Sequence, residues 1–302
     1  MNIEPLLFHR PESLKEAFEL GRSLGGGATF LAGGTELVPD FRRGREAPSH
    51  VISLSGLSEL RGIELRRGQL RVGALVTIEE ICESAAVREW LPSLAEAASL
   101  LASPQIRNLA TIGGNFCRAV PCADTPPVCI AAGSHVVLVS ERGARTLPAE
   151  QLFTGPRQTV LEPGELLREI SIPAQPDRSG GSYQRFAHRR GSALAVAAVA
   201  ARVVLDGDRV EDARIVLGAV GPTPLMAHNS AAILSGAVPS DEAVARAAKE
   251  AAGESEPISD LRGSAEFRRQ LVEVLTARAL RVAIERARIG GSGPGDETRI
   301  SS

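Results

Sequence analysis

The chain has 302 residues, of which 43% are hydrophobic and 23% charged, and its formal net charge at pH 7 is −2. This composition predicts a globular protein of two or three domains, and the lack of a basic excess argues against a nucleic-acid partner. No apolar run reaches the roughly 20 residues of a membrane-spanning helix, and the first residues lack the basic-then-apolar layout of a secretory signal, so we expect a cytoplasmic protein.

The N-terminal part of the chain predicts one helix and two short strands. Ser13 is the expected N-cap of a helix whose apolar residues repeat as far as Leu20, and Gly21 together with Gly25-Gly26-Gly27 is expected to close it. The segment ATFLAGGTELVPDFRRG (28–44) predicts a short strand that ends at a glycine pair, and HVISLSGL (50–57) predicts another strand.

The middle of the chain predicts two hairpins and several helices. GIELRRGQLRVGALVTIEEIC (62–82) predicts a hairpin followed by a helix that starts at Thr77, where Thr-Ile-Glu-Glu resembles a capping box. A further helix is expected from Leu91 to Leu101, and VCIAAGSHVVLVSERGARTLPAEQL (128–152) predicts the end of a helix and a second hairpin.

A shift to Pro, Gly and Ser in PAQPDRSGGS (173–182) predicts a domain boundary. After it, residues 193–220 predict a long buried element, a turn and a strand, and residues 240–252 and 264–288 predict a helical hairpin. In the second of these helices we expect an apolar face formed by Phe267, Leu271, Val274 and Leu275, with the arginines on a solvated face. The tail from 290 to 302 is expected to be disordered.

Two glycine pairs share one design. Ala32-Gly33-Gly34-Thr35-Glu36 and Thr111-Ile112-Gly113-Gly114-Asn115 each follow an apolar stretch and end in a small polar side chain. Glycine lets a backbone approach a ligand closely and present consecutive N–H groups to an anion, so two such loops could bind a diphosphate together. Either pair alone is typical of a tight turn. The phosphate-loop pattern and the Gly-x-Gly-x-x-Gly pattern of ordinary dinucleotide folds are both missing.

The four cysteines do not form a recognised metal-binding pattern. The spacing Cys117-x4-Cys122-x6-Cys129 contains no Cys-x-x-Cys, and the five histidines are scattered. We therefore expect no metal site and no catalytic residue, and we interpret the cysteines as small buried side chains or thiols near a cofactor.

In their order and spacing, AGGTELVPDFRRG, TIGGNFCRAVPCADTPP and SYQRFAHRRGSALAVAAVAA resemble the FAD-binding medium subunit of molybdenum hydroxylases, the family of xanthine dehydrogenase and carbon monoxide dehydrogenase. The resemblance covers nearly the whole chain apart from the tail. It implies an α+β fold: a two-subdomain FAD-binding domain of the PCMH type, similar to vanillyl-alcohol oxidase, over 1–175 (subdomains about 1–55 and 56–175). A C-terminal α/β domain with a three-stranded sheet and helices would follow over 180–289.

The resemblance also implies an FAD site. The first glycine loop would wrap the FAD diphosphate, with Leu31, Ala32, Gly33, Gly34, Thr35, Glu36 and Leu37. The second would lie along the cofactor, with Thr111, Ile112, Gly113, Gly114 and Asn115. Asp124 would bind the polar chain or adenosine end of FAD, Leu161 or Val160 would pack near the flavin, and Arg185 would approach the flavin ring and favour its anionic reduced form. Valine at Gly33 or Gly114 is expected to abolish FAD binding while leaving the fold largely intact.

The implied activity is electron transfer within a complex, with FAD as the cofactor. Electrons from a large molybdopterin-binding subunit would pass through a small subunit with two 2Fe–2S clusters to FAD, and then to NAD or another acceptor, in a dimer of heterotrimers. A four-iron cluster found in one branch of the family is not implied, because the inserted loop of that branch is missing. A scaffold subunit with little or no FAD and a stand-alone flavin oxidase are the alternatives.

Overall fold

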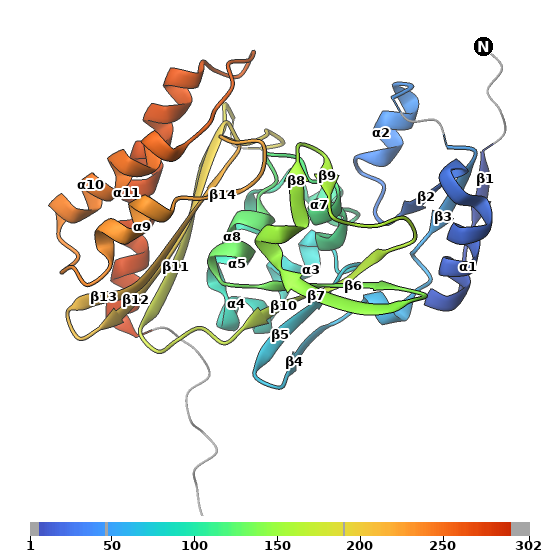
Figure 1. Ribbon diagram of the computed structural model, residues 1–302, viewed down its shortest axis with the longest axis horizontal. Helices are drawn as coiled ribbons and strands as arrows, with labels where there is room; N and C mark the ends of the chain where they lie inside the picture. The colour runs from blue at the N-terminus through green and yellow to red at the C-terminus, as the bar shows by residue number, and fades with distance from the viewer. Residues whose placement is uncertain (1–5, 46–47, 190, 291–302) are drawn as a thin grey trace, which may run out of the picture.

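The computed structural model describes residues 6–45, 48–189 and 191–290, and its sheets follow one another along the longest axis of the molecule (Figure 1). The N-terminal elements form one end, a five-stranded sheet with its helices forms the middle, and the C-terminal sheet forms the other end. Among the described residues, no helix is both long and apolar enough to cross a membrane.

The N-terminal unit is a three-stranded parallel sheet with the order β1-β3-β2. Its elements are β1 (Leu7–His9), α1 (Leu14–Leu24), β2 (Ala28–Leu31), α2 (Leu37–Arg42) and β3 (His50–Ser53). The predicted N-cap is confirmed, because Ser13 Oγ accepts a hydrogen bond from Glu16 N at 3.2 Å. Of the glycines expected to close this helix, Gly21 lies inside it, and Gly25, whose φ of +55° suits glycine, ends it after Leu24.

The middle unit is an antiparallel sheet with the order β4-β5-β10-β6-β7. Its strands are β4 (Ile63–Arg66), β5 (Gln69–Gly73), β6 (His135–Ser140), β7 (Gly143–Pro148) and β10 (Leu166–Pro173), and a small hairpin adds β8 (Phe153–Gly155) and β9 (Gln158–Thr159). Both predicted hairpins, β4–β5 and β6–β7, are confirmed.

Six helices accompany this sheet in the described part of the chain: α3 (Ile78–Glu83), α4 (Ala85–Trp90), α5 (Pro92–Leu100), α6 (Pro104–Arg107), α7 (Ile112–Cys117) and α8 (Thr125–Ala131). The capping box is confirmed, because Thr77 Oγ1 accepts from Glu80 N at 3.1 Å and Glu80 Oε2 accepts from Thr77 N at 2.6 Å. The helix expected from Leu91 to Leu101 is present as α5.

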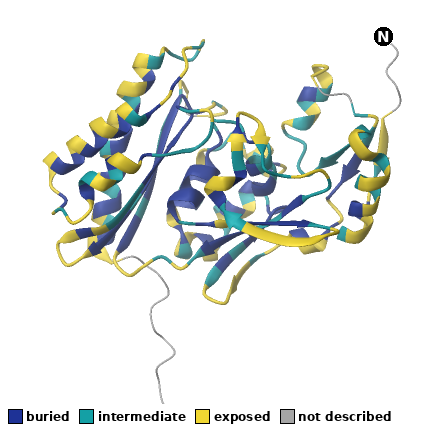
Figure 2. Ribbon diagram, in the orientation of Figure 1, coloured by how far each residue is buried: buried dark blue, intermediate teal, exposed yellow. Residues whose placement is uncertain are grey.

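The C-terminal unit packs helices on one antiparallel sheet. Its elements are β11 (Ser179–Phe186), β12 (Ala197–Asp206), β13 (Arg209–Gly218), β14 (Leu225–Met226), α9 (His228–Leu234), α10 (Asp241–Glu254) and α11 (Ala265–Ile289). The three long strands are the expected sheet, and the two-residue β14 pairs with the outer edge of β13. Buried residues gather where the helices face this sheet (Figure 2).

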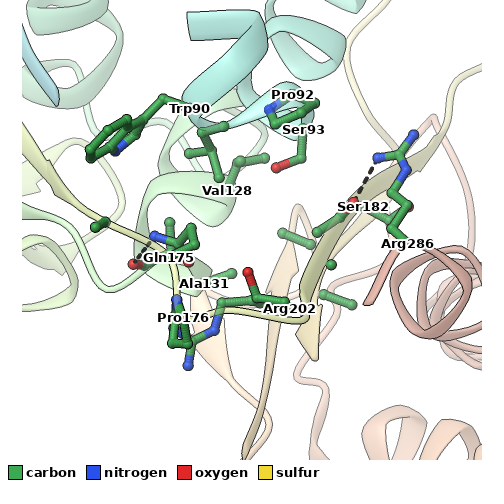
Figure 3. A pocket seen from close by; sticks show the side chains of 18 of the residues that line it. Trp90, Pro92, Ser93, Val128, Ala131, Gln175, Pro176, Ser182, Arg202 and Arg286 are labelled. Atoms are coloured by element: carbon green, nitrogen blue, oxygen red, sulfur yellow. Dashed lines mark hydrogen bonds between the residues drawn. The ribbon is translucent and has the colours of Figure 1, made fainter. Parts of the chain in front are cut away.

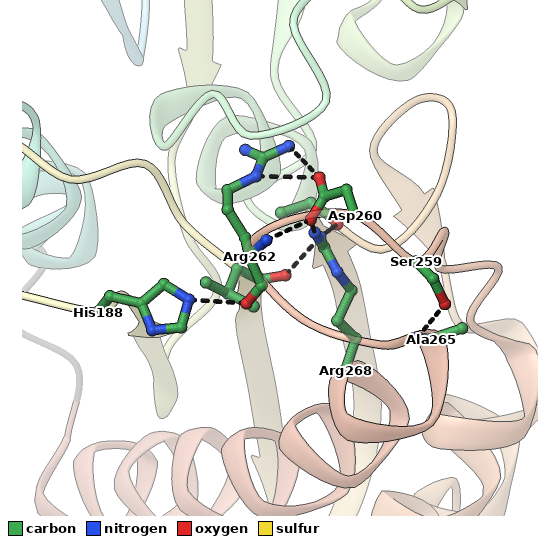
Figure 4. Close-up of polar contacts among 8 residues, drawn as sticks. His188, Ser259, Asp260, Arg262, Ala265 and Arg268 are labelled. Atoms are coloured by element: carbon green, nitrogen blue, oxygen red, sulfur yellow. Dashed lines mark hydrogen bonds and ion pairs between the residues drawn. The ribbon is translucent and has the colours of Figure 1, made fainter.

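The surface of α11 differs from the expectation in two ways. Leu275 is buried as expected, but Phe267 and Val274 are 37% and 46% exposed, and the buried face of the helix continues through Ala279 and Ala283. Arg268 is fully buried rather than solvated: it donates to the carbonyls of Val196 and Ala219 at 3.0 and 3.1 Å and to Asp260 Oδ1 at 2.5 Å (Figure 4). A buried arginine is tolerated there because a carboxylate and two carbonyls accept its hydrogen bonds.

The strand β11 begins at Ser179, inside the segment predicted as a domain boundary. The division into 1–175 and 180–289, with subdomains meeting near residue 55, stays a prediction. The expected disordered tail lies outside the described residues from position 291 onward.

Candidate functional site

The two glycine loops meet at one cavity of about 570 Å³. The first loop connects β2 to α2, and the second leads into α7. The predicted site residues that line this cavity are Leu31, Ala32, Gly33, Gly34, Thr35, Glu36, Leu37, Thr111, Gly113, Gly114, Asn115, Asp124 and Leu161. Arg185, Ile112 and Val160 are not among its lining residues.

The first loop carries backbone donors that no protein group uses. In the described part of the chain, the N–H groups of Gly34, Thr35, Glu36 and Leu37 donate to no protein acceptor, whereas Val38 N donates to Gly34 O at 3.0 Å. Gly34 adopts φ +71°, which glycine reaches without strain. A run of unused N–H groups on a turn is a site for an anion, so this loop can hold a phosphate or diphosphate.

The second loop has a similar sequence, but its backbone N–H groups donate hydrogen bonds to protein acceptors. Ile112 N donates to Val76 O and Gly113 N to Ala74 O, both at 2.9 Å. Gly114 N donates to Thr111 Oγ1 at 3.0 Å and Asn115 N to Thr111 O at 2.9 Å. This loop can therefore offer a ligand close approach and a side chain, but not a second row of backbone donors.

Asn115 supplies that side chain. Its Oδ1 accepts from Thr125 Oγ1 at 2.7 Å, which fixes the orientation of the amide and leaves its NH₂ group available as a donor. Because Asn115 lines the cavity, this donor can serve a ligand.

The glycines also allow parts of the protein to pack against each other. A Cβ at Gly33 would collide with the backbone carbonyl of Leu109, which precedes the second loop, and one at Gly113 would lie 2.6 Å from Ala74 O. A Cβ at Gly114 would meet Thr111 Oγ1 at 3.0 Å and no other atom within 4 Å. Valine at Gly33 would first contact protein backbone, so the expectation that it leaves the fold largely intact stays a prediction that this geometry argues against.

Asp124 and Arg185 form a buried pair. The side chains are 7% and 5% exposed, and Arg185 Nη1 lies 2.9 and 3.0 Å from the two carboxylate oxygens. Burial raises the pKa of Asp124, while Arg185 and the hydroxyl of Tyr183, which donates at 2.7 Å, act to lower it. Asp124 lines the cavity and compensates the charge of Arg185, which does not line it, so the contact of Asp124 with FAD and the approach of Arg185 to a flavin ring stay predictions.

Tyr183 was not identified from the sequence, although it is the only tyrosine in the chain. It stands two residues before Arg185 on β11, so the two side chains share one face of the strand. That spacing is the only signal that could have linked it to Asp124, which lies 59 residues away in the sequence.

The cysteines near the cavity are protonated thiols. Cys117 and Cys122 both line it, and burial raises the pKa of Cys117 to about 12 and that of Cys122 above its ordinary value. A thiolate is the form that attacks substrates or binds metals, so neither role suits them. No group of three or more His, Cys, Asp or Glu within the described ranges could hold a metal ion.

A second cavity, of about 450 Å³, lies between the middle unit and the C-terminal sheet (Figure 3). Trp90, Gln175, Arg202 and Arg286 line it, together with small side chains, and none of the predicted site residues does. Some of its polar groups already bind protein: Arg286 pairs with Glu96 at 2.5 Å, and Gln175 Nε2 donates to two backbone carbonyls, whereas Gln175 Oε1 and Arg202 Nε have no hydrogen-bond partner among the described residues. The first cavity is therefore the candidate site.

The first cavity suits a dinucleotide cofactor. Its volume falls within the roughly 300 to 1,000 Å³ of small-molecule sites, and unused donors stand at one part of its wall. Apolar side chains supply much of the remaining wall, namely Leu101, Leu161, Leu166, Leu167 and Leu194. A charged diphosphate and an apolar ring system could each find a matching surface.

The sequence matches two family models. The model described as FAD binding domain in molybdopterin dehydrogenase matches residues 2–175, and the model described as CO dehydrogenase flavoprotein C-terminal domain matches residues 182–283.

Curated relatives align over almost their whole length. The carbon monoxide dehydrogenase medium chain of Hydrogenophaga pseudoflava is 37% identical, covering 91% of this chain and 96% of the relative. The xanthine dehydrogenase FAD-binding subunit of Escherichia coli O157:H7 is 30% identical, covering 93% of this chain and 96% of the relative.

Solved structures show the same fold. A chain of carbon monoxide dehydrogenase from Hydrogenophaga pseudoflava superimposes with a TM-score of 0.91 at 36% identity, covering 95% of this chain and 99% of the other. A chain of quinoline 2-oxidoreductase from Pseudomonas putida 86 gives a TM-score of 0.89 at 30% identity, with coverages of 95% and 99%.

Proposed function

Because the chain belongs to the family of FAD-binding subunits of molybdenum hydroxylases, we propose that it is the subunit that passes electrons through FAD within such a complex. It is an oxidoreductase subunit, and FAD is its cofactor. The electrons come from iron–sulfur clusters on a small partner subunit, supplied in turn by a large molybdopterin-binding subunit, and leave to NAD or another acceptor. The relatives are named as a medium chain and as an FAD-binding subunit, which supports an assembly with partner chains. The dimer of heterotrimers is part of our proposal.

The observation that carries this proposal is the meeting of two glycine loops at one cavity. The N–H groups of Gly34 to Leu37 hold the FAD diphosphate, and Asn115 donates to the cofactor from the opposite loop. Leu161 and the neighbouring apolar side chains pack near the flavin and exclude water from it. When bound, FAD supplies the electron transfer itself, and the protein contributes binding, orientation and electrostatics.

The test is whether the full chain carries FAD. We expect the purified protein to show the visible absorption of bound flavin in a 1:1 ratio. Gly114→Val should lose this absorption, because the valine side chain would occupy space in the cavity that the second loop lines. Gly26→Val is the matched control, since a Cβ at Gly26 meets no atom within 4 Å and lies outside the cavity. A colourless wild-type protein after expression with added riboflavin would favour the scaffold alternative.

The partners are tested separately. We expect a tagged chain to co-purify with a large molybdenum-containing subunit and a small iron–sulfur subunit from the native host. Oxidation of a substrate by the isolated chain, with no partner bound, would support the flavin oxidase alternative instead.

A further inference from the structure

One buried carboxylate, Asp40, stands at the centre of a group of arginines. Its side chain is 2% exposed, and Oδ2 accepts from Arg118 and, at 3.0 Å, from Arg157. Arg45 and Arg43 approach Oδ1 at 3.4 and 3.9 Å. The sequence did not single out this residue.

The arginines come from three separate segments. Arg43 and Arg45 follow α2, the helix that contains Asp40, and Arg118 is the C-cap of α7. Arg157 lies in the turn between β8 and β9. One carboxylate therefore ties α2 to both the end of α7 and this hairpin.

The hairpin is attached to α7 by its backbone as well. Arg157 N donates to Ala119 O at 2.8 Å, and both residues adopt positive φ, +61° and +48°. Non-glycine residues occupy this region only where the surroundings impose it. The Asp40 contacts thus belong to a tightly determined junction.

This junction lies at the far ends of the two short helices that begin at the glycine loops. The first loop leads directly into α2, which starts at Leu37, and the second leads into α7, which starts at Ile112. The loops also touch near their own ends, because Gly33 packs against the Leu109 carbonyl. The two segments are therefore in contact at two places: Gly33 packs against Leu109, just before the second loop, and Asp40 of α2 binds Arg118 at the end of α7.

The charge balance makes this link sensitive to Asp40. A buried carboxylate is stable when positive charges surround it, and replacing Asp40 removes the carboxylate that Arg118 and Arg157 both contact. Without that shared contact, α2 is no longer tied to the end of α7 and to the β8–β9 hairpin. The backbone donors of Gly34 to Leu37 would then move relative to Asn115.

We propose that Asp40 is a positioning residue for the cofactor: by binding Arg118 and Arg157 it fixes the distance between the two glycine loops, without touching FAD itself. This inference rests on the proposed function. Asp40 is not among the residues that line the cavity, and neither is Arg157, whereas Arg118 does line it.

The experiment measures FAD affinity of the full-length apoprotein by flavin fluorescence. We expect Asp40→Asn to weaken binding about tenfold or more, a change of one decade in Kd, while circular dichroism stays that of the wild type. Arg42→Gln is the matched control, since Arg42 is an exposed residue of the same helix, and its Kd should stay within twofold of the wild type. Asp40→Glu, which keeps the charge, should recover part of the affinity.

A double-mutant cycle with Arg157→Gln distinguishes positioning from general damage. If Asp40 acts through Arg157, the two substitutions together should weaken FAD binding by less than the product of their separate effects. Multiplicative effects, or an unchanged Kd in both single variants, would overturn the inference. If Asp40→Asn fails to fold, Arg157→Gln alone decides, because Arg157 is 43% exposed and should still weaken FAD binding. A wild-type chain that binds no FAD would instead refute the proposed function.

Discussion

At the residue scale, two glycines in similar sequence motifs differ in what surrounds them in the fold. Gly33 and Gly114 each belong to a Gly-Gly pair before a polar residue. Gly33 makes room for the backbone of Leu109, whereas Gly114 faces only the hydroxyl of Thr111. A substitution at Gly33 should therefore disturb the packing of the protein more than one at Gly114.

We therefore expect Gly33→Ala to lower the free energy of unfolding by about 2 kcal/mol, in the range of overpacked sites. Gly114→Ala should change it by less than about 0.5 kcal/mol. Urea unfolding of the two apoproteins measures the difference. Equal stabilities would show that the Leu109 carbonyl moves away without cost.

The Asp260–Arg268 contact gives a prediction on pH. Burial alone would raise the pKa of Asp260, but hydrogen bonds from Arg262 and Arg268 outweigh it and hold the pKa well below its usual range. The folded state therefore binds this proton less readily than the unfolded chain. The resulting stability is present above the unfolded pKa of about 3.9 and is lost as pH falls toward the folded pKa.

Asp260→Asn should cost about 3 kcal/mol near pH 7, because it leaves Arg268 buried without its carboxylate. The difference in the free energy of unfolding between wild type and variant should become smaller as pH is lowered below about 4. Chemical unfolding at several pH values measures this difference. A gap that stays constant down to acid pH would mean that ionised Asp260 does not stabilise the fold.

Much of the site could be predicted residue by residue, and some of it could not. Both glycine loops and Asn115, which short motifs mark, line one cavity, and so does Leu161, which the family resemblance alone indicated; their contacts with FAD stay predictions. Tyr183 and Asp40 were missed because their partners are distant in sequence: Arg157 is 117 positions from Asp40. A pattern within one segment does not encode such pairs.

At the scale of elements, local signals were reliable and tertiary packing was not visible. The caps at Ser13 and Thr77 could be predicted because each depends on a hydrogen bond three residues away. The continuation of α1 past Gly21 could not, since packing decides whether a helical glycine is tolerated. Tertiary packing, which the local pattern does not show, also decides that Phe267 on α11 is partly exposed.

The contact between β11 and α11 depends on Gly180. A Cβ there would collide with the carbonyl of Ala283 and lie 2.6 Å from Ala287 N. Gly180→Ala should therefore push the helix from the sheet and lower the free energy of unfolding by about 2 to 3 kcal/mol.

The control for this substitution is Gly253→Ala. Gly253 lies in α10 and a Cβ there meets no atom within 4 Å, so alanine should stabilise the protein by about 0.4 to 1 kcal/mol. Thermal unfolding of both variants tests the pair. A stable Gly180→Ala protein would contradict the packing described for α11.

At the scale of the whole molecule, the cavity joins units that are separate in the sequence. Its wall includes the first loop from the N-terminal sheet, α7 from the middle unit, and Leu194 from the connection between β11 and β12 of the C-terminal sheet. A ligand that contacts all three should stabilise the folded state as a whole. The two glycine motifs indicated that two separate segments could share a diphosphate, and the family resemblance identified that ligand as FAD.

We expect added FAD to raise the unfolding temperature of the apoprotein in a concentration-dependent way. Free FAD at 100 times its Kd should add about 2.7 kcal/mol to the free energy of unfolding. Riboflavin, which has no phosphate to engage Gly34 to Leu37, should add much less at the same concentration. Equal stabilisation by both would place the main affinity at the flavin rather than at the first loop.

The unused N–H groups belong to the N-terminal unit, whose buried residues Ala17 and Phe18 share the smallest of the three buried clusters in the described chain with Val137, Val139 and Leu166 of the middle sheet. Small clusters open more often than large ones. The lifetime of the complex with FAD should thus follow the opening rate of this small unit, not the rate of global unfolding. Cofactor exchange then becomes possible in a molecule whose C-terminal sheet stays folded throughout.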